Sequence, residues 1–149
     1  MAVKPIPSGY RTVTPYLMVR EGGALIEFLK QAFEAVEIRR TLHPEGRIMN
    51  AEIRIGDSVV MVGEATSEFQ AMPCSIYLYV EHTDATYERA LQAGGISIMK
   101  PADQFYGDRN AGVKDPTGNH WWIATHQEDV SSKEMEKRMK DLFSSKEKA

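Results

Sequence analysis

Thr14-Pro-Tyr-Leu-Met-Val-Arg20 and Ser75-Ile-Tyr-Leu-Tyr-Val-Glu81 decide the fold, because the second stretch repeats the first 61 residues further along the chain. The correspondence continues without a gap into the residues that follow. The identical pairs are Tyr16/Tyr77, Leu17/Leu78, Val19/Val80, Ala24/Ala85, Glu27/Glu88, Gln31/Gln92 and Ala32/Ala93. At the far end, Val59-Val-Met-Val62 falls on His120-Trp-Trp-Ile123, each after a turn sequence. Agreement at both ends of the unit indicates an internal repeat, with copies at about residues 10–66 and 72–126.

The residue patterns predict one strand, one helix and three further strands in each copy. In the first copy the expected strands are 12–19, 37–43, 47–55 and 58–64, and the helix is 23–35. The second copy begins with strand 74–80 and helix 84–93, with Thr83 as N-cap and Gly94-Gly95 as a stop. The tail, 131–149, opens with a capping-box pattern at Ser131 and Glu134 and predicts an amphipathic helix. The expected fold class is α+β, with tandem βαβββ modules in one domain, residues 1–130, plus a C-terminal helix.

The composition is that of an ordinary globular protein of 149 residues, with 42% hydrophobic and 26% charged residues. The net charge of −3 provides no basic surface for a phosphate backbone, so we expect no nucleic-acid partner. No apolar run is long enough to span a membrane, and we expect no membrane partner. The single Cys74 and the lack of a signal-like N-terminus favour the cytoplasm.

Strand alternation divides the side chains of each sheet between a helix-covered face and a free face. If Ile55 pairs with Ser58 across Gly56-Asp57, then the helix-covered face collects apolar residues. These are Met49, Ala51, Ile53, Ile55, Val60 and Val62. The free face then holds Asn50, Glu52, Arg54 and Met61, with Thr14, Tyr16 and Met18 from the first strand. The repeat adds Ser75, Tyr77, Tyr79, His120, Trp122 and Ala124 from the second copy. Two such faces opposite each other would enclose a pocket rich in Tyr and Trp.

The tandem repeat, with a second copy ending in Asp115-Pro-Thr-Gly-Asn119, resembles the vicinal oxygen chelate superfamily of glyoxalases, bleomycin-resistance proteins and extradiol dioxygenases. Other stretches are similar to its PhnB-like bacterial branch. They are Thr14–Val19, Ala51-Glu-Ile-Arg-Ile-Gly-Asp57, Phe105-Tyr-Gly-Asp-Arg109, Asp115–Gly118 and Ile123-Ala-Thr-His126. The resemblance implies the βαβββ fold and a homodimer, with modules paired within one chain or between two.

In metal-using members of that superfamily, four side chains on the free faces hold a divalent ion. Carried over by position, they would be Thr14, Met61, Ser75 and Trp122. None is a suitable ligand, because the hydroxyls are weak neutral donors, the thioether is soft and the indole offers only an N–H. A pair of Glu52 and His120 would be too few ligands for a stable site. We therefore expect neither a metal site nor another cofactor.

Several site residues have two interpretations. Glu52 is a candidate general base or an anchor for a cationic ligand, or else it forms a structural ion pair with Arg54. The rings of Tyr16, Tyr77, Tyr79 and Trp122 form a stacking cage for a small molecule, or fill the space between sheets. Arg109, with Asp108, gates the pocket or braces a loop. His126 caps or packs locally, and His120 is a strand histidine.

The predicted function is binding of a small aromatic or amphipathic molecule in the cleft without a metal ion. The ligand-binding candidates are Tyr16, Asn50, Glu52, Arg54, Met61, Tyr77, Tyr79, Arg109, His120 and Trp122, and Glu52 is the catalytic candidate. The alternative is a lyase, isomerase or dioxygenase that uses displaced metal ligands or Glu52 as general base. A third interpretation is an interaction module whose aromatic face only builds a dimer.

Overall fold

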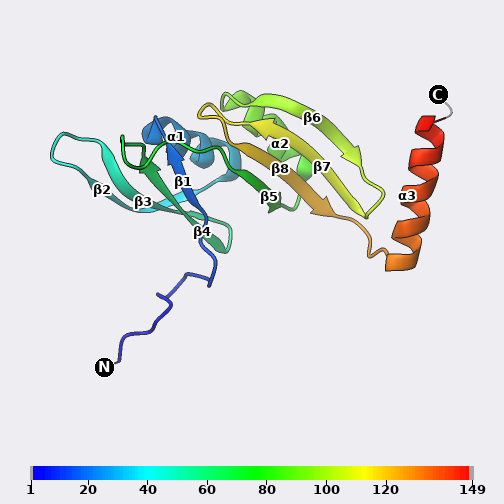
Figure 1. Ribbon diagram of the computed structural model, residues 1–149, viewed down its shortest axis with the longest axis horizontal. Coiled ribbons are helices and arrows are strands. Elements are labelled where there is room, and N and C mark those ends of the chain that lie inside the picture. The colour runs from blue at the N-terminus through cyan, green and yellow to red at the C-terminus, as the bar shows by residue number, and fades with distance from the viewer. Residues whose placement is uncertain (1, 148–149) are drawn as a thin grey trace.

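The computed structural model describes residues 2–147, which fold into two four-stranded sheets and three helices (Figure 1). Module one consists of β1 (Tyr16–Val19), α1 (Gly22–Phe33), β2 (Val36–Leu42), β3 (Ile48–Ile55) and β4 (Ser58–Glu64). Module two consists of β5 (Ser75–Tyr79), α2 (Thr83–Gln92), β6 (Ile96–Asp103), β7 (Asp108–Lys114) and β8 (His120–His126). The chain ends in α3 (Ser132–Glu147). The α+β class and the tandem βαβββ order are confirmed.

Both sheets have the same topology, which is the structural form of the sequence repeat. Their strand orders are β1-β4-β3-β2 and β5-β8-β7-β6, with the first pair parallel and the others antiparallel. In the β3–β4 hairpin, Ile55 pairs with Ser58 and Glu52 with Met61, as predicted from the Gly56-Asp57 turn. This register fixes which side chains lie on each free face, defined here as the sheet face without a helix.

One apolar core runs through both modules. The apolar stripe of α1 is buried, including Leu25, Phe28 and Leu29, and α1 also contacts α2. Phe33 at the end of α1 reaches Trp121 of β8, with ring centroids 5.1 Å apart. Each such buried side chain contributes about 1.5–3 kcal/mol through removal of apolar surface from water. The sheets therefore lie side by side around adjacent helices (Figure 1).

The prediction that Met49 packs under the helix is wrong. Met49 is 48% exposed, whereas its neighbour Ile48 is 4% exposed and lies next to Gly22 of α1. The cause is an irregularity in the β2–β3 ladder, where Thr41 pairs with Asn50 but Leu42 pairs with Ile48. An extra residue in one strand reverses the alternation of faces beyond it.

The start of α2 also differs from the prediction. Thr83 is the first helical residue, and the N-cap is His82, which makes no side-chain capping bond. The Thr83 hydroxyl instead donates to the carbonyl oxygen of Arg109 at 2.8 Å and so ties the helix to β7. Past the end of α2, Gly94 adopts a φ of +104°, which explains the glycine stop.

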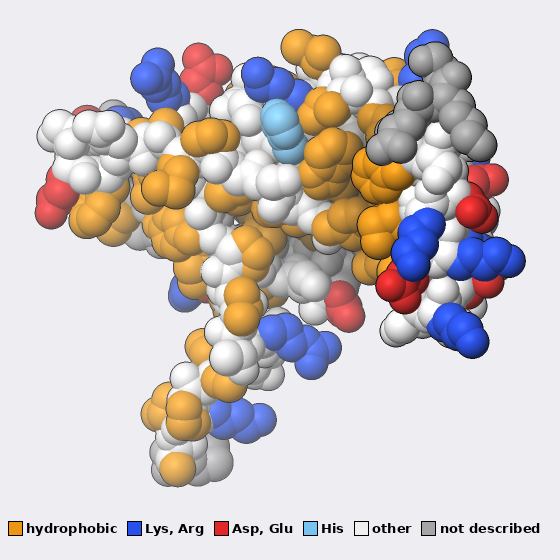
Figure 2. Space-filling view, turned by 45° about the vertical axis from the view of Figure 1, so that its right-hand side comes forward, with side chains coloured by type: hydrophobic (Ala, Val, Ile, Leu, Met, Phe, Trp, Pro, Cys, Tyr) orange, Lys and Arg blue, Asp and Glu red, His pale blue; other side chains and the backbone are white. Residues whose placement is uncertain are grey.

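The C-terminal helix α3 stands apart from the sheets (Figure 1). Its predicted capping contact is present, because the backbone N–H of Glu134 donates to the Ser131 hydroxyl at 3.1 Å. Arg138 connects the helix to the body by donating to the carbonyl oxygen of Phe105 and to Glu128. Charged side chains face outward on α3, and hydrophobic ones lie nearer the sheets (Figure 2). Residues 148–149 of the predicted tail lie outside the described residues.

Across residues 2–147, no helix is both long enough and apolar enough to cross a membrane.

Candidate functional site

The free face of module one carries a row of side chains from all four strands. Arg39 of β2 pairs in register with Glu52 of β3, Glu52 with Met61 of β4, and Met61 with Tyr16 of β1. Three of the predicted site residues, Tyr16, Glu52 and Met61, therefore lie in adjacent strands on one face. Asn50 joins them, because its amide donates to the Tyr16 hydroxyl at 3.3 Å.

Glu52 is a buried carboxylate, 8% exposed, with both oxygens engaged. Its Oε2 lies 3.0 Å from Nε of Arg39, and its Oε1 accepts a hydrogen bond from the Tyr10 hydroxyl. Burial and the bond to Glu52 raise the pKa of Tyr10 to about 12. Because these partners fix the carboxylate, they favour an anchoring role for Glu52, and its general-base role stays a prediction.

The alternative in which Glu52 forms an ion pair with Arg54 is wrong. The basic partner is Arg39, which lies directly opposite Glu52 on the neighbouring strand. Side chains directly opposite across a ladder are closer than side chains two residues apart on one strand. Arg54 is exposed further along β3.

The N-terminal segment forms a wall beside Glu52 that the sequence did not reveal. A cavity of about 610 Å³ is bordered by Pro5, Ile6 and Tyr10 of this segment and by Glu52 and Met61 of the sheet. The sequence feature that could have indicated this wall is the pair of prolines at positions 5 and 7, since they favour an extended, stiff segment.

The free face of module two has an indole where module one has a thioether. Trp122 pairs in register with Tyr77 and with Gly112, and its Nε1–H donates to the Ser75 hydroxyl at 2.9 Å. A Cβ added at Gly112 would lie 2.6 Å from Cζ3 of Trp122, so the ring needs the glycine beneath it. His120 lies next to this ring, with centroids 6.5 Å apart.

These contacts test whether the chain offers the superfamily's metal ligands. Two of the four carried-over positions, Ser75 and Trp122, are hydrogen-bonded to each other, and the other two are Thr14 and Met61. Among the described residues, no group of three or more His, Cys, Asp or Glu side chains is arranged to hold a metal ion. The donor set at these positions therefore does not fit a divalent ion.

A polar cluster around Asp108 lies at one end of the same face. Asp108 is 3% exposed and accepts hydrogen bonds from the hydroxyls of Tyr77, at 2.7 Å, and Tyr79, at 3.0 Å. Its other oxygen lies 2.8 Å from Nδ1 of His126, whose Nε2 lies 2.8 Å from Asp129. The sequence placed Asp108 and His126 at the ends of strands but did not bring them together.

The cluster shifts the pKa values of Tyr77, Tyr79, Asp108 and His126. Burial raises the pKa of Tyr77, and the hydrogen bond from Tyr77 to Asp108 raises it further. Tyr79 donates its own hydrogen bond to Asp108, which raises the pKa of Tyr79. Burial opposes ionisation of Asp108, but hydrogen bonds from His126, Tyr77 and Tyr79 outweigh it and lower the pKa. The bonds to Asp108 and Asp129 raise the pKa of His126. The arrangement stabilises a carboxylate beneath two phenols.

Asn110 completes the cluster and leaves one polar atom without a partner. Its amide nitrogen lies 3.2 Å from the Tyr77 hydroxyl and 2.6 Å from that of Tyr106. Its Oδ1 is buried and has no hydrogen-bond partner among the described residues. Buried polar atoms are normally paired, so Oδ1 is an exception among the described residues.

The structure places Arg109 away from the other site residues. Its guanidinium binds Asp84 of α2 at 2.7 and 2.9 Å and Asp103 of β6 at 3.2 Å. Because Asp108 faces the free side, alternation along β7 directs Arg109 to the helix side. Of its two interpretations, the bracing one agrees with these contacts.

The two free faces do not lie opposite each other within one chain. Figure 1 shows the two sheets side by side. Glu52 lies in β3 of one sheet and Trp122 in β8 of the other. Tyr77 and Tyr79 border a cavity of about 850 Å³ beside the β3–β4 turn, which is separate from the cavity at Glu52. The predicted residues thus form two half-sites, one per module.

Two mycobacterial proteins are similar in sequence to most of this chain. An uncharacterised protein of Mycobacterium bovis is 31% identical over 138 residues, covering 85% of this chain and 91% of that protein. An uncharacterised protein of Mycobacterium tuberculosis is also 31% identical over 138 residues, with 85% and 81% coverage.

Two solved structures share the fold. TioX from Micromonospora sp. ML1 has a TM-score of 0.62 at 19% identity, covering 76% of this chain and 98% of that one. The PhnB protein from Bacillus cereus has a TM-score of 0.62 at 16% identity, covering 77% and 99%. Residues 12–123 match the family described as Glyoxalase/Bleomycin resistance protein/Dioxygenase, and the chain belongs to this superfamily.

Proposed function

We propose that the protein binds a small flat or amphipathic molecule on the aromatic free face of module two, without a metal ion in the site. The observation that carries the proposal is the exposure of Tyr77, 42%, and Tyr79, 63%, above the buried Asp108. Aromatic rings left open on a sheet provide stacking surface for a planar ligand.

The cluster beneath the rings supports binding because it fixes them before a ligand arrives. Each phenol is held by Asp108, and the two rings lie 5.3 Å apart with their planes at 60°. Less side-chain entropy is lost when a binding surface is already ordered.

We propose that the second wall of the cleft comes from a second copy of the chain. In one chain the free faces lie side by side, so closing a ligand between two sheets requires another molecule. A homodimer would set Glu52 and its neighbours opposite Trp122. Light scattering coupled to size-exclusion chromatography tests this arrangement, and a monomer at micromolar concentration in the presence of ligand would contradict it.

The metal-dependent isomerase and dioxygenase chemistries of the superfamily are not part of the proposal. Their ion would need hard oxygen or imidazole ligands at positions where this chain has Thr14, Met61, Ser75 and Trp122. Elemental analysis after incubation with Ni²⁺, Zn²⁺, Mn²⁺ or Fe²⁺ and desalting tests this point. Stoichiometric metal that is lost in Glu52→Ala or His120→Ala would overturn the metal-free proposal.

Calorimetric titration with planar probes tests the binding site itself. We would use proflavine and 2-naphthol, with cyclohexanol as a non-planar probe of similar polarity to 2-naphthol. We expect a planar probe to bind, and Tyr79→Leu and Trp122→Leu each to weaken it about tenfold through loss of stacking. Phe69→Leu is the matched control, because Phe69 is 60% exposed in the linker between modules. Equal affinity in all variants, or no binding of either planar probe, would refute the proposal.

A further inference from the structure

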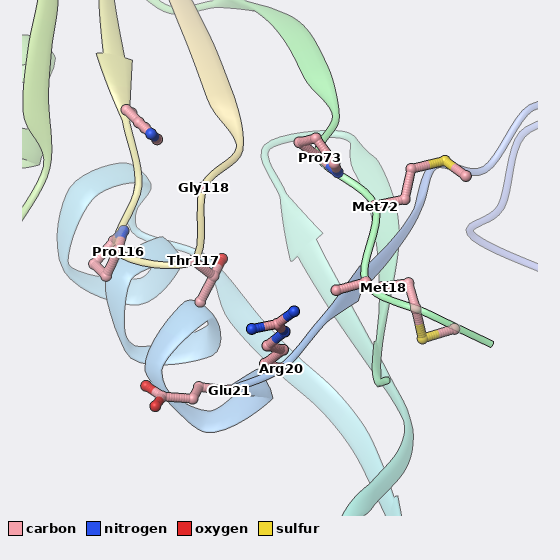
Figure 3. Close-up of a pocket in the computed structure, with 10 residues that line it drawn as sticks. Met18, Arg20, Glu21, Met72, Pro73, Pro116, Thr117 and Gly118 are labelled. Carbon is pink, nitrogen blue, oxygen red and sulfur yellow. The ribbon is translucent and has the colours of Figure 1, made fainter. Parts of the chain in front are cut away.

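A cavity of about 510 Å³ lies at the junction of the two modules, where β1 ends and β7 turns into β8 (Figure 3). The end of β1 contributes Met18 and Arg20, the linker contributes Met72, and the β7–β8 turn contributes Pro116. We propose that this cavity binds a small organic anion, with a carboxylate or phosphate head and an apolar body.

Two cationic side chains line the cavity, one from each module. Arg20 follows β1 and Lys114 ends β7, and both are exposed. Neither side chain has a hydrogen bond or ion pair within residues 2–147. The guanidinium of Arg20 extends into the space between the β7–β8 turn and the linker (Figure 3).

Within residues 2–147, no acidic side chain at or near the cavity forms an ion pair with Arg20 or Lys114. Glu21 extends away from Arg20 (Figure 3). Asp115 is buried and accepts hydrogen bonds from Thr117 and from Nε1 of Trp121. Glu64 accepts the backbone N–H groups of Gly22 and Ile48. Arg20 and Lys114 are therefore both available to a bound anion, although Glu21 also lines the cavity.

The N-terminus of α1 is not the anion anchor, because Glu64 already occupies its first N–H at Gly22. The anchor is the pair of cations, and Arg provides a planar donor fork that matches carboxylate and phosphate oxygens.

The remaining wall is apolar and adaptable. Met18 is half-buried and Met72 is 67% exposed, and the ring of Pro116 lies across the cavity from them (Figure 3). Unbranched thioether side chains adjust to ligands of different shape. A ligand would place its anionic head against Arg20 and Lys114. Its short aliphatic or aromatic body would then pack against Met18 and Met72.

Calorimetry with octanoate, octyl phosphate and octan-1-ol tests the proposal. We expect the two anions to bind and the alcohol to bind more weakly, because it lacks the charge. Arg20→Gln and Lys114→Gln should each reduce anion affinity about threefold, and together about tenfold, as for partly exposed charge pairs. Lys100→Gln is the matched control, since Lys100 is an exposed β6 lysine with no ion pair among the described residues.

The outcomes separate this site from the aromatic face. If the double variant binds octanoate as the unaltered protein does, or if the alcohol binds equally well, the junction site is refuted. If Tyr79→Leu loses octanoate binding while the double variant of Arg20→Gln and Lys114→Gln retains it, the anion binds on the free face of module two. That outcome would also refute the junction site. All substituted residues are exposed, and thermal unfolding of each variant verifies that it is folded.

Discussion

The two modules share one backbone plan but have different chemistry at equivalent positions. The equivalent rows are Arg39, Glu52, Met61 and Tyr16 in module one and Met99, Gly112, Trp122 and Tyr77 in module two. Module one places a charged pair where module two places a glycine beneath an indole. Topology and register thus fix where side chains lie, whereas residue type decides what each face can bind.

The hairpins that set these registers differ as well. In module one, Asp57 is exposed and accepts one side-chain bond, from Ser58. In module two, Asp115 is 2% exposed and accepts bonds from residues within its turn and at the start of the strand that follows. These bonds come from Thr117 N and Oγ1, Asn119 N and Nδ2, and Trp121 Nε1.

Asp115→Ala gives the largest expected effect. It leaves the buried donors of Asn119 and Trp121 without an acceptor, which should destabilise the protein by about 3 kcal/mol or more. Urea unfolding measures the change. Asp57→Ala is the matched control and should cost about 0.5 kcal/mol or less, as for other surface substitutions. Equal effects of the two variants would show that the hairpins are energetically alike.

Gly112→Ala tests the space under Trp122. The added methyl would overlap the indole, with an expected loss of about 1–3 kcal/mol from overpacking or displacement of the ring. Denaturant unfolding gives the energy, and Trp fluorescence reports ring displacement. Gly23→Ala, where a Cβ meets no atom within 4 Å in α1, should be neutral or stabilising by up to about 1 kcal/mol. A neutral Gly112→Ala would contradict the glycine's proposed role.

A double-mutant cycle of Glu52→Gln and Arg39→Met measures the charged pair of module one. Arg39 is 71% exposed on its side chain, so we expect a coupling energy of about 0.2–1 kcal/mol. Replacement by Met introduces the residue that module two carries at the equivalent position. A coupling of several kcal/mol would mean that the pair is far less hydrated than its exposure indicates.

His126→Gln should give the smallest effect, and the effect should depend on pH. The folded-state pKa of His126 is raised, so its stabilising contribution is complete below the ordinary value and is lost as pH rises through the folded value. Unfolding at pH 5.5 should therefore show a larger loss in His126→Gln than unfolding at pH 8.5. His82→Gln is the control, since His82 makes no side-chain cap bond. A loss that grows with pH would contradict the ion-pair assignment.

The repeat, the strand register and most free-face residues could be predicted because they depend on local periodicity and one short turn. The partner of Glu52 could not, because the β2–β3 register depends on a longer loop and on the irregularity that exposes Met49. The Asp108 cluster was missed for a related reason. Tyr77, Asp108 and His126 lie on three different strands and meet only when module two is assembled.

The contact between Phe33 and Trp121 also bears on how the chain folds. These rings join the end of the first helix to the last strand, across most of the sequence. Two modules that share one core cannot unfold independently of each other. We therefore expect a single cooperative unfolding transition. Contacts of such large sequence separation also slow folding, because the chain must close a long loop before the core forms. Each module therefore depends on the other for part of its core.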